Sequence, residues 1–154
     1  MMKQGHKEID INREIDAPPR RVFRAWVDPQ QVAQWWGPNG FTNPVVELDV
    51  RPGGPIRIDM RAPDGTVSTM GGEYGEVIEN ERIEFTSTAF PDENGDPQLE
   101  ARSTVSFEDR DGKTVLVWYE AVTRSTPAVA AALEGMEEGT RQTLDRLARF
   151  IEKS

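Results

Sequence analysis

The side chains that most often carry enzyme chemistry are scarce in this sequence. It contains no cysteine, which excludes disulfides, thiolate nucleophiles and thiolate metal sites. His6 is the only histidine, and it lies near the amino terminus in a segment that we expect to be frayed. General acid–base chemistry would therefore fall to carboxylates. These are abundant, with 27 Asp and Glu residues against 18 Lys and Arg residues.

Individual carboxylates could do such chemistry only if the fold buries them or brings them together. Glu73 and Glu76 are three residues apart in a predicted strand, so alternation should place them on opposite faces. Glu14 and Glu120 lie in other predicted strands, and burial of either would raise its pKa. The acidic loop 91–96 lacks the ligand spacing of a calcium-binding loop. We therefore predict no catalytic residue, no metal site and no cofactor.

Length and charge limit the partners of this chain. The 154 residues fit one domain, 1–154, with a core at about 8–151. The formal net charge of −9 would repel nucleic acid and anionic membrane surfaces. No segment approaches about 18 consecutive apolar residues, and the start has no apolar signal segment. We predict a cytoplasmic protein that does not bind nucleic acid and does not insert into a membrane.

Local patterns predict the elements that would position these side chains. Residues 8–16 alternate between apolar and polar types, as a half-buried strand does. Two short helices follow, one opened by Ala17-Pro18-Pro19 and one by Asp28-Pro29, and the second ends at Gly37-Pro38. Six further strands are predicted near residues 46–51, 56–61, 67–78, 83–87, 101–107 and 114–122. The last strand is apolar at 115–119, which predicts burial of both its faces.

The segment 125–154 predicts one long amphipathic helix. Ser125 and Thr126 can each cap its start and Pro127 suits its first turn, and apolar side chains then recur every three or four residues. Gly135 and Gly139 interrupt it, which predicts a bend or the close approach of a strand. Tight turns join most of the strands, so the sheet should be antiparallel. The predicted fold class is α+β, with a curved seven-stranded antiparallel sheet wrapped around the long carboxy-terminal helix.

Several motifs, in their order and spacing, resemble those of a known superfamily. They are Ile15-Asp16-Ala17-Pro18 with Val22–Trp26, Trp35-Trp36-Gly37-Pro38, Arg51-Pro52-Gly53-Gly54, and Gly135-Met136 with Gly139. From about Glu8 to Ile151 the chain is similar to the SRPBCC (START-like, birch-pollen-allergen-like) superfamily. Within it, the chain resembles the small stand-alone prokaryotic members of the activator of heat-shock-protein-90 ATPase homologue family. The resemblance implies a helix-grip fold and an apolar cavity that holds a lipid, sterol, polyketide or other small hydrophobic molecule.

Such a cavity would be lined by inward-facing strand residues and by the apolar stripe of the last helix. The candidate ligand-binding residues are Phe41, Leu48, Ile58, Met60, Met70, Tyr74, Phe85, Val105, Phe107, Trp118, Leu133 and Met136. Tyr74 and Trp118 could each orient an apolar ligand through one polar group. The alternative is that these side chains simply fill the core, and Trp118 could exchange faces with Tyr119. We expect Trp35 and Trp36 to anchor the short helices rather than to contact a ligand.

The sequence leaves three functions open. The first is non-catalytic binding of a small hydrophobic molecule between the sheet and the last helix. The second is a chaperone-associated or stress-response role exerted through the surface, with a chaperone as the partner. The third is a cyclase-like or hydrolytic activity, ranked last because the candidate pocket contains neither histidine nor cysteine. A monomer and a homodimer are both compatible with the sequence.

Overall fold

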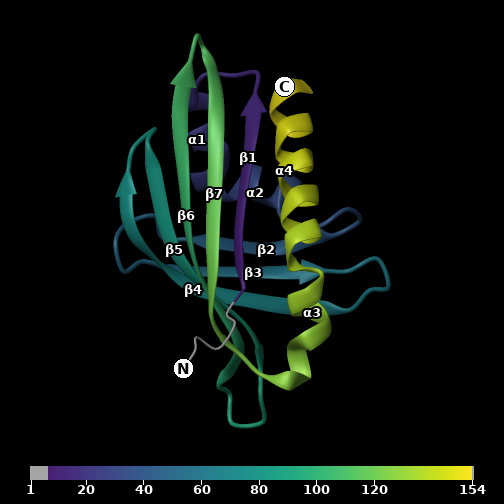
Figure 1. Cartoon of the computed structure of the whole chain (residues 1–154). Helices are drawn as coiled ribbons and strands as arrows, with labels where there is room; N and C mark the ends of the chain where they lie inside the picture. The colour runs from purple at the N-terminus through teal and green to yellow at the C-terminus, as the bar shows by residue number, and fades with distance from the viewer. Residues whose placement is uncertain (1–6, 154) are drawn as a thin grey trace.

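The computed structural model describes residues 7–153, so the expectation of a frayed segment around His6 lies outside the described residues. The described chain forms a curved sheet that wraps around its carboxy-terminal helix (Figure 1). The elements are β1 (Glu8–Ile15), α1 (Pro19–Val27), α2 (Pro29–Trp35), β2 (Thr42–Leu48), β3 (Pro55–Arg61), β4 (Val67–Ile78), β5 (Arg82–Pro91), β6 (Pro97–Arg110), β7 (Lys113–Ser125), the 3-10 turn η1 (Pro127–Val129), α3 (Ala130–Glu134) and α4 (Met136–Lys153). The predicted α+β helix-grip fold is confirmed.

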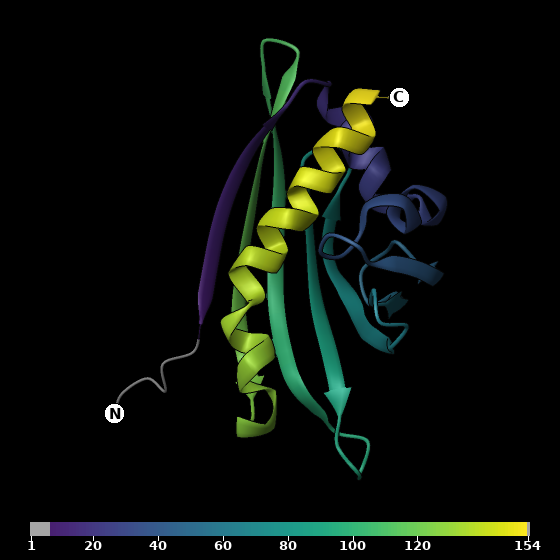
Figure 2. The same ribbon diagram turned by 90° about the vertical axis from the view of Figure 1, so that its right-hand side faces the viewer.

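The seven strands follow the order β1-β7-β6-β5-β4-β3-β2, and every neighbouring pair is antiparallel. The first strand therefore pairs with the last, while β2 to β7 form a meander joined by turns. Figure 2 shows α4 running diagonally across one face of the curved sheet, with α1 and α2 to one side of it. This face is concave, and none of the described helices lies on the opposite, convex face (Figure 2).

The two short helices form where the sequence predicts them. Pro19 occupies the first turn of α1, where a missing N–H costs nothing. The Asp28 side chain caps α2 by accepting a hydrogen bond from the Gln30 N–H at 3.0 Å. Gly37 follows the end of α2 with a φ of +94°, a conformation that glycine adopts at low cost.

An aromatic cluster fixes these helices to the sheet. Trp35 is completely buried, and its Nε1 donates to the Ala25 carbonyl at 3.1 Å. The ring centroid of Trp26 lies 4.9 Å from that of Trp35 and 5.1 Å from that of Trp118 on β7. Trp36 also joins the cluster, 5.8 Å from Trp118. The cluster therefore spans α1, α2 and the concave face in one contiguous apolar body.

The carboxy-terminal segment differs from the predicted single helix at its start and near its middle. β7 continues as far as Ser125, and helical structure begins only at Pro127 with η1. Gly135 then separates α3 from α4, which agrees with the bend predicted there, whereas Gly139 lies inside α4. Thr126 occupies the position before η1, but its hydroxyl donates to the Gln98 side chain at 2.8 Å instead of capping the turn.

The prediction that β7 is buried on both faces is wrong. Trp118 is 4% exposed and Tyr119 is 37% exposed, so alternate residues face the covered concave side and the open convex side. Burial of Leu116 and Glu120 follows the same alternation as Trp118. The apolar run arises because half-buried valines occupy part of the convex face. The open choice between Trp118 and Tyr119 is thereby settled in favour of Trp118 as the inward residue.

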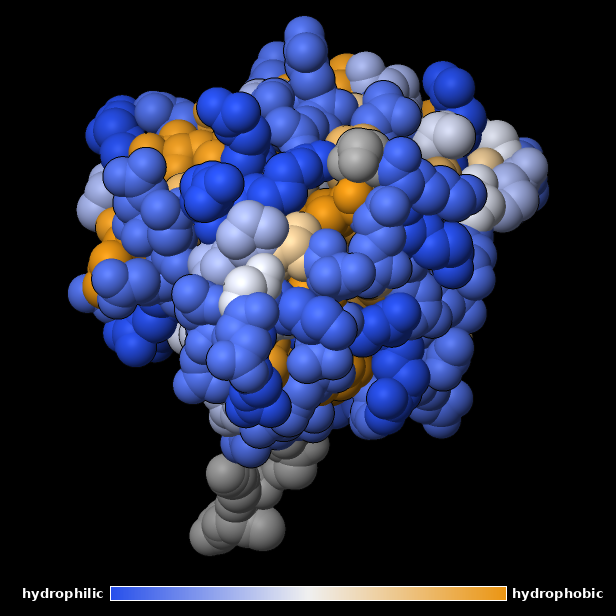
Figure 3. Space-filling view, turned by 90° about the horizontal axis from the view of Figure 1, so that it is seen from above, coloured by the Kyte–Doolittle hydropathy of each residue, from blue (hydrophilic) through white to orange (hydrophobic). Residues whose placement is uncertain are grey.

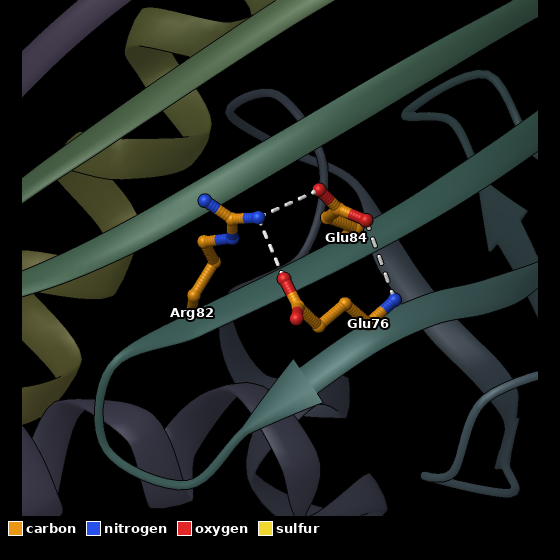
Figure 4. Close-up of polar contacts among 3 residues, drawn as sticks. All are labelled: Glu76, Arg82 and Glu84. Atoms are coloured by element: carbon orange, nitrogen blue, oxygen red, sulfur yellow. Dashed lines mark hydrogen bonds and ion pairs between the residues drawn. The ribbon is translucent and has the colours of Figure 1, made fainter.

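A β-bulge overturns the expectation for Glu73 and Glu76. The β4–β5 register shifts so that two residues of β4, one of them Glu76, lie opposite the single residue Glu84. Both carboxylates are consequently exposed. Arg82 Nη2 contacts Glu76 Oε1 at 2.6 Å and Glu84 Oε2 at 3.2 Å (Figure 4). These side chains form a surface ion-pair group, and surface pairs of this kind contribute little to stability.

Candidate functional site

The concave face and the helices over it form a partly open cavity of about 540 Å³. Its walls come from the strands of the sheet, from the segment after α2, from α3 and from the first two turns of α4. Cavities that hold small molecules in proteins measure roughly 300–1,000 Å³ and are mostly apolar. The cavity is therefore large enough to hold a small organic molecule.

The structure brings half of the predicted site residues to this cavity. Those on its wall are Phe41, Met60, Met70, Phe85, Trp118 and Met136. Leu48, Ile58 and Tyr74 instead line an adjacent apolar void of about 20 Å³, which also touches Met70 and Phe85. Val105 and Phe107 are buried in the core. Leu133 is half-buried on α3 and lies on neither wall.

Tyr74 was expected to supply a polar group to the ligand. It is 5% exposed, and burial raises the pKa of its phenol, so the hydroxyl stays protonated. Its position on the small void places it behind Met70 and Phe85, which line both spaces. That any of the predicted residues contacts a ligand stays a prediction.

Sequence reasoning missed the part of the wall that consists of small helical residues. Ala131, Gly135 and Gly139 line the cavity at a spacing of four, together with Ala132. Residues four apart share one face of a helix. The short side chains on this face leave the space that larger ones would fill. The sequence did contain a signal for this part of the wall. Small residues recur at helix positions where an apolar stripe usually carries large side chains.

Trp36 also lines the cavity, although we expected it only to anchor the short helices. It is 9% exposed and contacts both the cavity and the small void beside it. Its neighbour Trp35 does serve as an anchor, being completely buried. The two tryptophans of the Trp35-Trp36-Gly37-Pro38 motif thus have different places in the structure.

Segment α3 covers the cavity without being embedded in the core. None of its side chains is buried, yet Ala131 and Ala132 lie on the cavity wall. Gly135, at its end, has φ −85° and ψ 0°, which any residue can adopt. An element with few buried apolar contacts opens locally at low free-energy cost. We therefore expect this part of the cavity wall to open more easily than α4.

Glu120 is a single carboxylate on an otherwise uncharged wall. It is 6% exposed, and among the described residues that line the cavity it is the only ionisable one. Burial raises the pKa of the Glu120 carboxyl to about 7. Ser103 lies directly opposite in the β6–β7 register, and its hydroxyl offsets part of this shift. That hydroxyl makes no well-aligned hydrogen bond within the described residues.

The strand registers explain how Glu120 reaches this position. Glu120 pairs with Ser103, Ser103 pairs with Phe85 on β5, and Phe85 pairs with Tyr74 on β4. All four residues are buried, so they form one row across the concave face. On the other side, Glu120 pairs with the buried Ile9 of β1. The carboxylate is consequently flanked by Ser103 and Ile9 on the two neighbouring strands.

The arrangement offers no evident metal centre within the described residues, where no group of three or more His, Asp or Glu side chains is placed to hold an ion. In the acidic turn after β5, Asp92 Oδ1 already accepts hydrogen bonds from the N–H groups of Asn94 and Asp96, at 2.8 and 3.0 Å. Asp92 therefore closes the turn.

A larger hollow, about 700 Å³, lies outside the sheet between α1 and the β4–β5 turn. Arg20, Arg24 and Glu79 are among the residues that line it.

Seen from the end of the molecule that carries the β6–β7 hairpin, the surface is predominantly hydrophilic, with apolar atoms visible between polar ones (Figure 3). None of the described helices is both long and apolar enough to span a membrane. The cavity under α3 and α4 has a mostly apolar wall, whereas charged side chains line the larger hollow, so the cavity is the stronger candidate site for an apolar ligand.

Comparisons with known proteins agree with the fold. The family described as "Activator of Hsp90 ATPase homolog 1-like protein" matches residues 16–152. The crystal structure of protein CV1439 from Chromobacterium violaceum is similar over 94% of this chain and 97% of its own, with 29% identity and a TM-score of 0.81. A solution structure from Arthrobacter aurescens is similar over 96% of this chain and 87% of its own, with 26% identity and a TM-score of 0.83. No curated protein sequence matches this chain.

Proposed function

Because the chain belongs to the family of Activator of Hsp90 ATPase homolog 1-like proteins, whose fold is associated with small-molecule binding, we propose that it binds a small hydrophobic molecule without transforming it. The binding site is the cavity of about 540 Å³ between the concave face and the helices α3 and α4. The observation that carries the proposal is this cavity itself. A mostly apolar pocket of this volume fits a small organic molecule.

The wall supplies the chemistry that apolar binding requires. Phe85, Trp118 and the three methionines Met60, Met70 and Met136 present apolar and polarizable surface. Transfer of apolar ligand surface from water to this wall contributes roughly 25 cal/mol per Å². The methionine side chains can adjust to ligands of different shape, which favours a class of molecules over a single one.

The observations favour binding over catalysis. A general acid and a general base need two titratable groups near the reacting atoms, and Glu120 is the only such group among the described residues of the wall. The chaperone-associated alternative rests on the family's name, and no feature of the described surface favours it over the cavity.

The decisive experiment fills the cavity and measures binding of an uncharged apolar probe. We expect 1-decanol to bind the wild-type chain in isothermal titration calorimetry and to bind Met136→Trp at least tenfold more weakly. Met136 is half-buried on the cavity wall, so a larger side chain there occupies ligand space. Glu137→Trp, which adds the same ring at the next, exposed position, should bind like wild type.

Two results would overturn the proposal. One is the absence of decanol binding to wild type, and the other is equal binding to Met136→Trp while its circular dichroism spectrum and urea midpoint remain those of wild type. Native mass spectrometry of protein purified without detergent gives an independent reading. An added mass released by organic solvent would identify the natural ligand by its formula.

A further inference from the structure

The buried carboxylate of Glu120 has no use in a purely apolar binding site. It is 6% exposed, and no ion pair to it is present within the described residues. Removing a carboxylate from water without pairing it is costly, so a fold keeps one there at the expense of stability. On the wall of a ligand cavity, such a carboxylate can accept a hydrogen bond from a donor group of the bound ligand.

No well-aligned hydrogen bond to the Glu120 carboxylate is present among the described residues, where Ser103 Oγ and Trp118 Nε1 are buried and without a partner. Thr140 and Thr143 face the cavity from α4, but each hydroxyl donates to the backbone carbonyl four residues earlier, at 2.9 and 2.8 Å. Ser103 lies opposite on β6 and offers one hydroxyl. No Lys, Arg or His lines the cavity among the residues that the structure describes. The carboxylate therefore retains most of its hydrogen-bonding capacity.

We propose that Glu120 accepts a hydrogen bond from the polar end of the bound molecule, so that the cavity selects apolar molecules ending in a donor group, above all a protonated amine, and rejects those ending in a carboxylate. The proposal rests on the proposed function, because it assigns the ligand class of the same cavity.

Three physical terms favour an amine. A hydrogen bond between an ammonium and a carboxylate is charge-assisted and roughly twice as strong as a neutral one. Trp118 precedes Glu120 by two residues on the same face of β7, and its ring is also able to attract a cation. The net charge of −9 raises the local concentration of cations around the protein. A fatty acid would bring a second negative charge against Glu120, which is unfavourable.

The test uses three probes with the same alkyl chain, decylamine, 1-decanol and decanoate, titrated below their micelle concentrations at pH 8 and 0.15 M salt. At that pH Glu120, with its pKa near 7, is mostly charged. We expect wild type to bind decylamine at least tenfold more tightly than decanol, and decanoate at least tenfold more weakly than decanol. In Glu120→Gln the amine preference should fall to threefold or less while decanol binding persists.

The control is Glu108→Gln, which removes the same charge from an exposed position near the far end of β6. It should retain the amine preference, because a preference due to net charge alone would fall equally in both variants. Decanol binding without an amine preference, or an amine preference unchanged in Glu120→Gln, would overturn this inference and leave the proposed function intact. Failure of wild type to bind any of the three probes would overturn both.

Discussion

Arg146 on α4 donates a hydrogen bond of 2.9 Å from Nη1 to the backbone carbonyl of Trp36, at the end of α2. The same nitrogen also reaches the carbonyls of Gly37 and Pro38, at 3.0 and 2.9 Å. The last carbonyls of a helix have no partner within it and carry partial negative charge. One guanidinium therefore ties α4 to a segment that forms part of the cavity wall.

We predict that Arg146→Met, which keeps an apolar stem, lowers the free energy of unfolding by about 2 kcal/mol, because charged hydrogen bonds to backbone carbonyls are lost. Urea denaturation followed by circular dichroism measures the change. Arg149→Met, at an exposed position on the same helix, should alter the free energy of unfolding by less than about 0.5 kcal/mol. Equal effects of the two variants would contradict the assigned role of Arg146.

The titration of Glu120 predicts a pH dependence of stability. Its pKa is raised by burial from 4.5 to about 7 in the folded chain, so the folded state binds more protons between these values. Stability from this group is fully present below pH 4.5 and is lost as the pH rises to about 7. The shift corresponds to about 3 kcal/mol.

Glu120→Gln removes this titration. As the pH rises from 5 to 8, the wild type should therefore lose up to about 3 kcal/mol of unfolding free energy relative to Glu120→Gln. Above that range the difference between the two proteins should stay constant. Urea titrations across that range measure it. Glu108→Gln, at an exposed position, should show no such trend. A flat difference for Glu120→Gln would mean that the carboxyl titrates at its ordinary pKa.

A third prediction concerns the backbone contact at Gly72. A Cβ atom there would lie 1.9 Å from the carbonyl oxygen of Thr86 on the adjacent strand, which cannot give way without moving the sheet. Gly72→Ala should lower the unfolding free energy by about 3 kcal/mol. Gly75→Ala, three residues along β4, meets its neighbours at 3.4 Å or more and should change it by less than about 1 kcal/mol. A tolerated Gly72→Ala would contradict the close approach.

The junction between α3 and α4 gives a fourth prediction. Gly135→Ala should raise the unfolding free energy by about 1 kcal/mol, because alanine favours the helix and its Cβ meets only Ala131 O, at 3.7 Å. Hydrogen exchange should show the α3 amides exchanging faster than those of α4 in wild type, since α3 buries no side chain. Gly135→Ala should reduce the difference in exchange rate between the α3 and the α4 amides. Equal exchange rates in wild type would exclude a separately opening α3.

The fold could be predicted from the sequence because its signals are local. Strand alternation, the Asp28-Pro29 cap and the turns each act within a few residues, and together they identify the order of elements. The bulge at Glu76 and the extension of β7 to Ser125 depend on pairing with other strands, which no local pattern records. The division of the last helix was signalled by Gly135, but the sequence alone did not distinguish it from Gly139.

The candidate site was less predictable than the fold. Alternation identifies inward-facing residues, but sheet curvature decides whether each one reaches the cavity, as Phe85 does, or the packed core, as Phe107 does. Glu120 has the same parity on β7 as Trp118, so its inward position followed once that residue was placed. The choice between Trp118 and Tyr119 needed the pairing with β1 and β6, because both residues are aromatic and both suit a strand.

The four tryptophans of this chain all belong to the one aromatic cluster that joins α1 and α2 to the sheet. Indole rings with centroids 4.9 to 5.9 Å apart couple electronically, so the near-ultraviolet dichroism should depend on how the rings of the cluster are arranged. Two of its members, Trp36 and Trp118, line the cavity. If the cavity binds a ligand as proposed, the signal of these two tryptophans should follow its occupancy in real time without any attached dye.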